Sequence, residues 1–413
     1  MSPDVDSRTD GNPQIKGALA ASLLRRILNC LEYGRIVVRT PEGVTLERQS
    51  GRPGPEGVIV LHRWRAIRRM LTQGDVAFAE AYVEGEWSTP DLAALLELAA
   101  LNIGGIDRTV GGFAPFRLLH RLGHLFRSNS KRGSRRNIAY HYDLGNDFYR
   151  LWLDPRMTYS SAIYESPSQS LEDAQDNKLS RIVDLVAPAN GDRVLEIGCG
   201  WGALAARLAD SGASVRGITL SSEQLAFAKD MVKRKGLSES IDFRIEDYRD
   251  SKGSFDRIVS IEMLEAVGEQ FWPAYFDTVR RLLKKDGHAV LQVITIHESR
   301  FESYRRGADF IQRYIFPGGM LPTDAIIRQQ AKASGLSLAH SEQFGQSYAL
   351  TLAEWRRRFL RNWPSIQRLG FDERFRQLWE YYLAYCEAGF RTGMIDVGLY
   401  VLKPQDSAVQ GGQ

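Results

Sequence analysis

The chain has 413 residues, of which 43% are hydrophobic and 25% charged, and its formal net charge is +4. This is ordinary globular composition with room for two domains, and the weak positive charge does not favour nucleic acid as a partner. No apolar run is long enough to cross a membrane, and the first residues are polar, so we expect a cytoplasmic protein. The cysteines at 30, 199 and 386 lie far apart, which predicts neither a metal site nor a disulfide framework.

The first third of the chain predicts a small α+β unit over residues 15–108, after a polar tail over 1–14 that we expect to be disordered. Apolar residues recur there at helical spacing in some stretches and alternate in others. The expected elements are a helix over Lys16–Glu32, a β-like stretch with a Pro-Glu-Gly turn over Gly34–Arg48, a strand over Val58–His62, and helices from Trp64 through Asp91–Leu101.

Residues 109–137 form a segment of different character. Leucine and phenylalanine alternate there with basic residues, among them Arg132, Arg135 and Arg136. A basic, amphipathic segment suits a surface of anionic lipid head groups, so we expect peripheral contact with a membrane. A solvated linker with one packed face is the alternative, and the segment alone does not decide between them.

Residues 138–404 predict an α/β domain, followed by a disordered tail over 405–413. Strand patterns alternate with helical patterns, which implies a parallel sheet with right-handed crossovers. The expected strands are Arg193–Ile197, Val215–Thr219, Ile241–Ile245, Phe255–Ile261 and His288–Thr295, and the first two helices are Ala203–Ser211 and Ser222–Lys235.

A glycine-rich turn follows the first of these strands. Its glycines, Gly198, Gly200 and Gly202, allow a tight turn and the close approach of a ligand, and ligands bind such sheets at the carboxyl ends of the strands. The surrounding residues differ from the dinucleotide-binding pattern. Glu196 precedes the glycines, Thr219 and Gln224 stand where a dehydrogenase has its ribose-binding acid, and Asp247 and Tyr248 follow the third strand, where they could hold an adenine edge.

This arrangement resembles the Rossmann-like class I methyltransferases, which use S-adenosylmethionine (SAM); a purely structural glycine turn is the alternative. Several further segments are similar to the cyclopropane fatty acid synthase family, which includes the mycolic acid cyclopropane synthases. The resemblance covers roughly residues 135–404. The matching segments are Tyr140–Tyr149, Met157–Ser161, Asp256–Glu265, Tyr314–Pro322, Phe344–Tyr348, Thr351–Trp355 and Tyr381–Phe390.

The resemblance implies an α/β fold with a Rossmann-like class I methyltransferase sheet and a helical lid, plus the small amino-terminal α+β domain. It also implies an enzyme that methylates a cis double bond in the acyl chain of a membrane phospholipid. Such an enzyme would work at the inner face of the cell membrane, and it could be a homodimer. Loss of a proton from the new methyl group closes a cyclopropane ring, and family enzymes hold a bicarbonate ion as the base. The anion cage implied here is Ser161, Glu265, Gln292, the backbone of Ile294, and Tyr348, and the implied cofactor contacts are Tyr159, Ser160, Gly198, Gly200, Thr219, Leu220 and Gln224.

Three positions depart from the family's cyclopropane-forming pattern. Ser161 replaces a cysteine, Gln292 replaces a histidine, and Ala266 replaces a histidine that follows Glu265. Serine and glutamine still form hydrogen bonds to an anion, so methyl transfer is expected to survive while ring closure is in question. The alternatives are a methyl- or methylene-branched chain or a furan fatty acid precursor, a methyltransferase acting on a small amine or oxygen nucleophile, and a non-catalytic lipid-binding protein.

Overall fold

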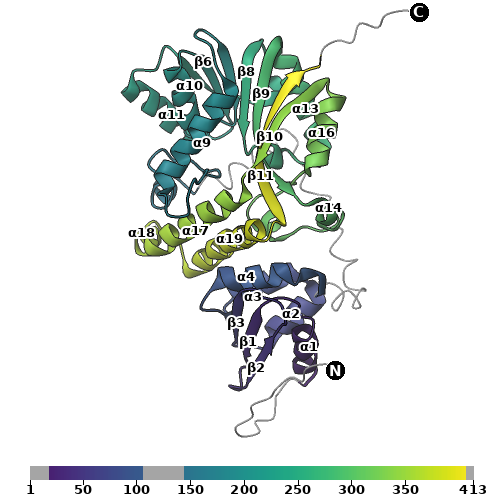
Figure 1. Cartoon of the computed structure of the whole chain (residues 1–413). Helices are drawn as coiled ribbons and strands as arrows, with labels where there is room; N and C mark the ends of the chain where they lie inside the picture. Colours follow the sequence, from purple (N-terminus) through teal and green to yellow (C-terminus); the bar gives the residue numbers. More distant parts are fainter. Residues whose placement is uncertain (1–17, 106–143, 406–413) are drawn as a thin grey trace, which may run out of the picture.

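The computed structural model describes residues 18–105 and 144–405, which form a lower and an upper unit in Figure 1. The expected tail over 1–14, the basic segment over 109–137 and the boundaries near 108 and 137 lie outside the described residues. Gln405, expected in the disordered tail, is described, and its Nε2 donates to the Leu336 carbonyl at 3.0 Å. The remainder of the tail expected over 405–413 lies outside the described residues.

The small unit has the predicted α+β character and contains a four-stranded sheet, of which the last strand was not predicted. Its strand order is β2-β1-β3-β4, with β1 antiparallel to β2 and parallel to β3. The turn expected at Pro41–Gly43 joins β1 to β2, and the Thr40 amide donates to the Val44 carbonyl across it at 2.8 Å. The elements are α1 (Ala18–Leu28), β1 (Arg35–Arg39), β2 (Thr45–Gln49), β3 (Glu56–Leu61), α2 (Arg65–Gln73), α3 (Asp75–Val83), β4 (Trp87–Ser88) and α4 (Leu92–Leu101).

The larger unit contains a seven-stranded sheet of order β10-β11-β9-β8-β5-β6-β7. The five predicted strands are confirmed as β5 to β9 and run parallel to one another, while β11 is antiparallel to both of its neighbours. Neither β10 nor β11 was predicted from the sequence. The strands are β5 (Arg193–Ile197), β6 (Ser214–Thr219), β7 (Ile241–Ile245), β8 (Phe255–Ile261), β9 (Leu283–Ile296), β10 (Leu336–Gln343) and β11 (Ile395–Pro404).

Helices cover both faces of this sheet, and two separate hydrophobic clusters fill the spaces between them. One face carries α9 (Leu171–Val186), α10 (Ala203–Asp210) and α11 (Ser222–Lys235), and the other carries α13 (Trp272–Leu282) and α16 (Asp324–Ala333). The remaining elements lie toward the carboxyl ends of the strands or connect them: α8 (Asn146–Arg150), η3 (Tyr248–Asp250), α12 (Leu264–Val267), η4 (Glu269–Phe271), α14 (Glu298–Arg305), α15 (Phe310–Tyr314), α17 (Gly345–Arg361), α18 (Trp363–Arg368) and α19 (Glu373–Arg391).

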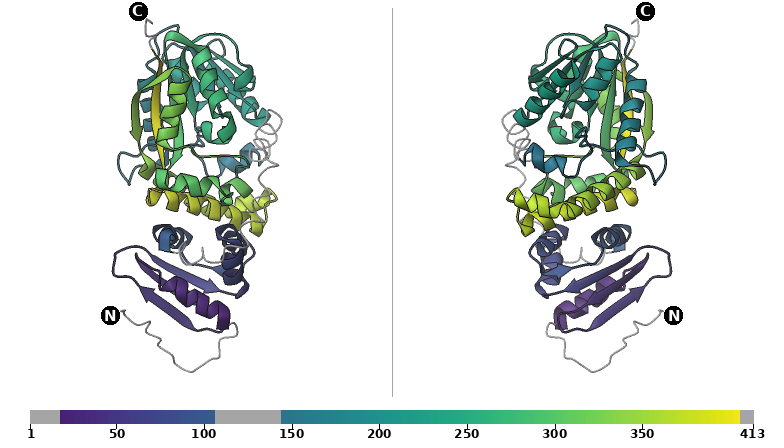
Figure 2. Two further views of the ribbon diagram at one scale, coloured as in Figure 1. Left: turned by 90° about the vertical axis from the view of Figure 1, so that its right-hand side faces the viewer. Right: turned by 90° about the vertical axis from the view of Figure 1, so that its left-hand side faces the viewer.

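The two units meet at α19, which Figure 2 shows as a yellow helix running above the helices of the small unit. The Tyr82 hydroxyl on α3 donates to Glu380 on α19 at 3.3 Å, and the ring of Tyr82 lies 5.8 Å from that of Tyr381. Arg313 forms an ion pair with Glu80 at 3.3 Å. One hydrophobic cluster contains buried side chains from both units. The small unit therefore closes the larger one from below.

Candidate active site

The described residues enclose a cavity of about 1510 Å³ at the carboxyl ends of the parallel strands. Most ligand pockets measure roughly 300–1,000 Å³, so this one has room for a cofactor and a long second ligand. Residues from both units line it. The glycine turn lies at one part of the wall, two buried carboxylates at another, and apolar side chains of the small unit at a third.

The predicted cofactor contacts supply the first part of this wall. Gly198 and Gly200 have positive φ angles of 82° and 52°. A Cβ at Gly200 would meet no heavy atom within 4 Å, so its backbone borders open space that a ligand can enter. The other predicted contacts on the wall are Tyr159, Thr219, Leu220, Gln224, Asp247 and Tyr248. Their side chains bring hydroxyl, amide and carboxylate groups to the ends of β6 and β7, which suits the amino acid, ribose and adenine parts of SAM.

The structure places three other predicted cofactor residues behind the cavity wall. Glu196 is buried near the amide of Ala205, and burial raises the pKa of its carboxyl to about 8. Gly202 has a φ of 89°, and a Cβ there would lie 2.7 Å from Phe243 Cζ. The hydroxyl of Ser160 accepts a hydrogen bond from Lys178 at 2.8 Å. These residues shape and support the glycine turn rather than line the cavity.

Three members of the expected anion cage converge on a carboxylate that the sequence analysis did not select, that of Glu262. The Ser161 amide and Gln292 Nε2 donate to its Oε1 at 2.8 Å and 2.7 Å, and the Tyr348 hydroxyl donates to its Oε2 at 2.7 Å. Glu262 follows the last residue of β8 and lines the cavity. Its place directly after a central strand, within the matching segment Asp256–Glu265, is the signal that could have identified it.

Glu265 and Ile294 form a separate pair within the expected cage. The Ile294 amide donates to Glu265 Oε1, while Oε2 is buried and has no hydrogen-bond partner among the described residues. Burial, with the charge of Glu262 adding to it, raises the pKa of Glu265 to about 8. Burial also raises the pKa of Glu262. The hydrogen bonds that Glu262 accepts from Tyr348, Ser161 and Gln292 oppose this rise, because they favour the ionised carboxylate.

A buried lysine, Lys178 on α9, accompanies these acids. Burial lowers the pKa of its ammonium to about 8, while the nearby charges of Glu262, Asp154 and Glu196 oppose that shift. Its one hydrogen bond to Ser160 leaves it beside the loop that carries Ser161. We interpret Lys178 as the cation that limits the negative charge of the acidic wall. Lys178 was not among the residues predicted from the sequence.

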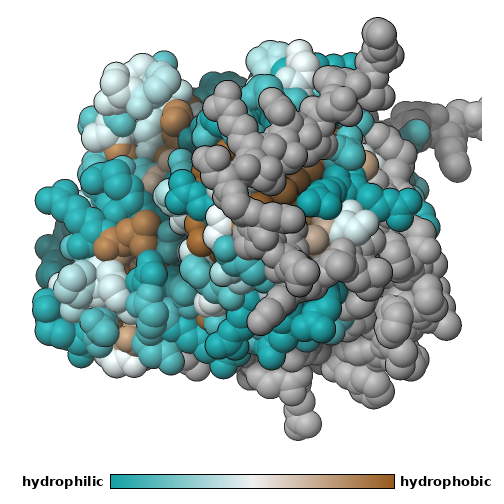
Figure 3. Space-filling model, turned by 90° about the horizontal axis from the view of Figure 1, so that it is seen from below, coloured by the Kyte–Doolittle hydropathy of each residue, from teal (hydrophilic) through white to brown (hydrophobic). Residues whose placement is uncertain are grey.

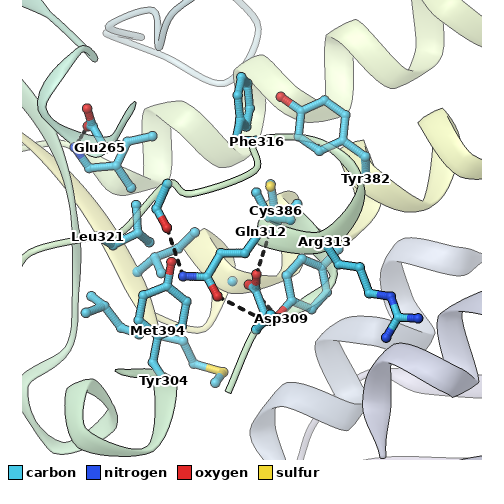
Figure 4. Close-up of a pocket in the computed structure, with 18 of the residues that line it drawn as sticks. Glu265, Tyr304, Asp309, Gln312, Arg313, Phe316, Leu321, Tyr382, Cys386 and Met394 are labelled. Carbon is cyan, nitrogen blue, oxygen red and sulfur yellow. Dashed lines mark hydrogen bonds between the residues drawn. The ribbon is translucent and has the colours of Figure 1, made fainter. Parts of the chain in front are cut away.

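Aromatic side chains continue the wall from the acids toward the small unit. The hydroxyls of Tyr159 and Tyr382 lie 2.8 Å apart, and the rings of Tyr382 and Phe316 are 6.4 Å apart at a steep angle (Figure 4). Tyr381 and Tyr385 also line the cavity. Phe148, Tyr149 and Phe310 instead lie in the hydrophobic core, and Tyr140 and Tyr142 lie outside the described residues.

The segment Arg300–Pro322, which contains most of α14 and all of α15, borders the cavity and corresponds to the helical lid that the resemblance implies. Asp309 begins α15 through a capping box, in which its carboxylate accepts the Gln312 amide at 2.9 Å and Gln312 Oε1 accepts the Asp309 amide at 3.2 Å. Gln312 Nε2 also donates to the Gly319 carbonyl at 2.9 Å, and these bonds are drawn in Figure 4. The capping box and the Gly319 bond hold the lid as one folded segment over the cavity.

Apolar side chains of the small unit line the remainder of the cavity. They come from the helices α1, α2 and α4 and from the inner face of the sheet. Examples are Leu24, Ile27, Ile36, Ile59, Met70, Leu95 and Ala99. From below, the described surface of this unit is largely hydrophilic, with hydrophobic residues in small patches that include one near the centre of the view (Figure 3).

The sequence matches the family model described as mycolic acid cyclopropane synthetase over residues 129–399. The chain belongs to this family. It is 40% identical over 360 residues to tuberculostearic acid methyltransferase UfaA1 of Mycobacterium tuberculosis, covering 83% of this chain and 82% of that relative. It is 36% identical over 329 residues to the cyclopropane-fatty-acyl-phospholipid synthase of Escherichia coli, covering 79% and 82%.

Solved structures of the family share the fold of the larger unit. The mycolic acid cyclopropane synthase CmaA1, complexed with SAH and CTAB, matches with a TM-score of 0.62 at 31% identity, over 65% of this chain and 97% of that one. Coclaurine N-methyltransferase matches with a TM-score of 0.61 at 16% identity, over 79% of this chain and 99% of that one, which shows the fold alone.

These findings confirm the predicted family, the Rossmann-like class I fold and SAM as the cofactor. The cyclopropane synthetase family member described here is a SAM-dependent methyltransferase that modifies lipid chains. Among its described residues, no helix has both the length and the hydrophobicity that a bilayer crossing requires.

Proposed function

We propose that this methyltransferase transfers a methyl group from SAM to the cis double bond of an unsaturated fatty acyl chain of a membrane phospholipid. The observation that carries the proposal is the single cavity that joins the glycine turn, two buried carboxylates and an apolar region in the small unit. A long hydrocarbon chain matches that apolar region better than a small amine or alcohol does. Both curated relatives described above act on fatty acyl substrates according to their names.

Different residues of the chain would bind the cofactor, exclude water and stabilise the cation that forms. When bound, SAM supplies an electrophilic methyl carbon. Gly198, Gly200 and Thr219 would hold it at one part of the cavity, and the lid and aromatic wall exclude water from the weakly nucleophilic alkene. Addition of the methyl group leaves a positive charge on the acyl chain. The rings of Tyr381 and Tyr382 and the acidic wall suit that transient cation.

The product predicted from the sequence is a cyclopropane ring. A methylene-branched chain is the second candidate, since the 40% identical relative is named as a methyltransferase rather than as a cyclopropane synthase. Both products add one carbon and two hydrogens and need only SAM and a base. A saturated methyl branch would also need a hydride donor.

The test uses the full-length protein, SAM and vesicles of a monounsaturated phospholipid, with saturated vesicles as the control. We expect release of S-adenosylhomocysteine and an acyl chain heavier by one CH2 only with the unsaturated lipid, and NMR then distinguishes ring from methylene. Turnover with small amines or alcohols but with none of the lipids would contradict the proposal. Calorimetry with SAM checks that each preparation is competent.

We further propose that the protein docks on anionic bilayers from the cytoplasmic side. The basic residues of the segment over 109–137 support this, as do Arg306 and Arg313, which are exposed and border the cavity. We expect co-sedimentation with anionic vesicles that weakens as salt rises and when Arg132, Arg135 and Arg136 are changed to Glu. Binding that is insensitive to both changes would count against a charged docking surface.

A further inference from the structure

The groups expected to hold an external anion already hold a carboxylate of the chain itself. A backbone amide, a side-chain amide and a tyrosine hydroxyl, from Ser161, Gln292 and Tyr348, all donate to Glu262. These donors come from three separate parts of the fold: the loop over Met157–Ser161, strand β9 and helix α17. Convergence of three donors from distant elements is the arrangement that binds an anion, and here the anion is covalently attached.

A bicarbonate ion does not fit the same place. It would need the donors that Glu262 occupies, and it would bring a further negative charge beside the carboxyl groups of Glu262 and Glu265, which are shielded from solvent. Like charges in a buried site oppose one another's ionisation. In this chain, therefore, the carboxylate of Glu262 occupies the position at which family enzymes hold an external anion.

We propose that the Glu262 carboxylate takes the place of the external anion and is the base that removes the proton from the methylated acyl chain. The enzyme then works without bicarbonate. This inference rests on the proposed function, because it names the base for that same reaction.

The proposed step balances with the groups already named. As the new carbon–carbon bond forms, the carbon–sulfur bond breaks and a cation remains on the neighbouring chain carbon. Glu262 Oε2 accepts the Tyr348 hydroxyl, and a carboxylate oxygen has room for a second partner, the departing proton. The electron pair of that C–H bond neutralises the cation, by ring closure or, after a hydride shift along the chain, as a double bond to the added carbon.

The backbone at Glu262 supports a specialised role. Its φ is 49°, in the left-handed region that favours glycine, and only two other non-glycine residues of the described chain have a positive φ. Such strain persists where the surroundings fix a residue for function. The positive φ also makes glycine the natural replacement at this position. Glu262→Gly removes the carboxylate, relaxes the backbone and leaves the three donors free for an added anion.

The first experiment measures turnover of the full-length enzyme with unsaturated vesicles in buffer stripped of carbon dioxide, with and without added bicarbonate. We expect the same rate in both. Glu262→Gln should lower kcat about a hundredfold or more, the range typical of losing a general base, while the affinity for SAM stays the same. The matched control is Glu239→Gln, which changes an exposed carboxylate outside the cavity and should leave the rate unchanged.

The second experiment is chemical rescue of Glu262→Gly. We expect this variant to melt no lower than the wild type, to bind SAM, to be inactive in stripped buffer and to regain activity saturably with bicarbonate or formate. A residue that only supported the fold would show no such rescue.

The outcomes separate this inference from the proposed function. A wild-type enzyme that methylates lipid only when bicarbonate is present, a Glu262→Gln variant that keeps its rate, or a folded Glu262→Gly variant that no anion rescues would each overturn the role of Glu262 and leave the function standing. A wild-type enzyme that binds SAM but methylates no unsaturated lipid in either buffer would instead overturn the proposed function.

Discussion

Gly200 and Gly202, two residues apart, are required for different reasons, and substitution by alanine separates them. Both have positive φ, but a Cβ at Gly200 points into open space whereas one at Gly202 meets Phe243. We expect Gly202→Ala to lower the free energy of unfolding by about 1–3 kcal/mol. Gly200→Ala should mainly weaken SAM binding. Thermal melting and SAM calorimetry on both variants check this, and equal losses of stability would contradict the assignment.

Glu265 should make the stability of the protein depend on pH. The ordinary pKa of a glutamate carboxyl, 4.5, is raised to about 8 by burial in the folded chain, so the folded state holds the proton more tightly than the unfolded state. The resulting stabilisation is complete below pH 4.5 and is lost as the pH rises to about 8.

Glu265→Gln stays neutral throughout this range. The melting temperature of the variant relative to the wild type should therefore increase from acidic to mildly alkaline pH. Glu239→Gln, which alters an exposed carboxylate, is the control, and a constant difference across the range would show that Glu265 is not held protonated.

At the scale of elements, the capping box at the start of α15 should govern the lid. Asp309→Ala removes the cap and is expected to cost about 1 kcal/mol of local stability, so the segment that borders the cavity should open more often. We expect a higher KM for the lipid and faster amide exchange in α14 and α15, with the affinity for SAM little changed. Asp309→Asn keeps an N-cap acceptor and is the control; identical kinetics for the two variants would exclude the cap as the cause.

The secondary-structure elements also show how much of the fold could be predicted from the sequence. Five parallel strands are recognisable because each contains closely spaced buried apolar residues, as with Val194 and Leu195 before the glycines. β10 is an edge strand with a mostly polar sequence, and β11 follows a long helix and reverses direction, so neither continues the alternating pattern. Three of the five expected cage members, Ser161, Gln292 and Tyr348, lie together, but the carboxylate at their centre was not predicted. Glu262 becomes conspicuous only when the loop, β9 and α17 are brought together in space.

At the scale of the whole molecule, the cavity has an apolar part that belongs to another unit of the chain. Sequence patterns could not predict this, because the contacts join residues as far apart as Tyr82 and Glu380. Each unit taken alone has a complete sheet and its own helices. Their shared hydrophobic cluster is a property of the folded chain only.

Narrowing this apolar part should change which acyl chains are accepted. Ala99 lies on α4 and lines the cavity, so Ala99→Trp is expected to favour shorter chains while leaving SAM binding intact. Ala94→Trp, on the same helix but away from the cavity wall, is the matched control. Mass spectrometry of products from vesicles of mixed chain length measures the shift, and an unchanged product distribution for Ala99→Trp would place the acyl chain elsewhere.

The position of α19 between the two units has a consequence for how such enzymes diversify. In the proposed function, the upper part of the molecule makes the new bond and the lower part holds the hydrocarbon chain. Substitutions on α4 and on the sheet beneath it should then change which lipid is accepted and leave the SAM-binding residues unaltered. A chimera that carries a relative's lower part should inherit that relative's choice of lipid and keep its own type of product.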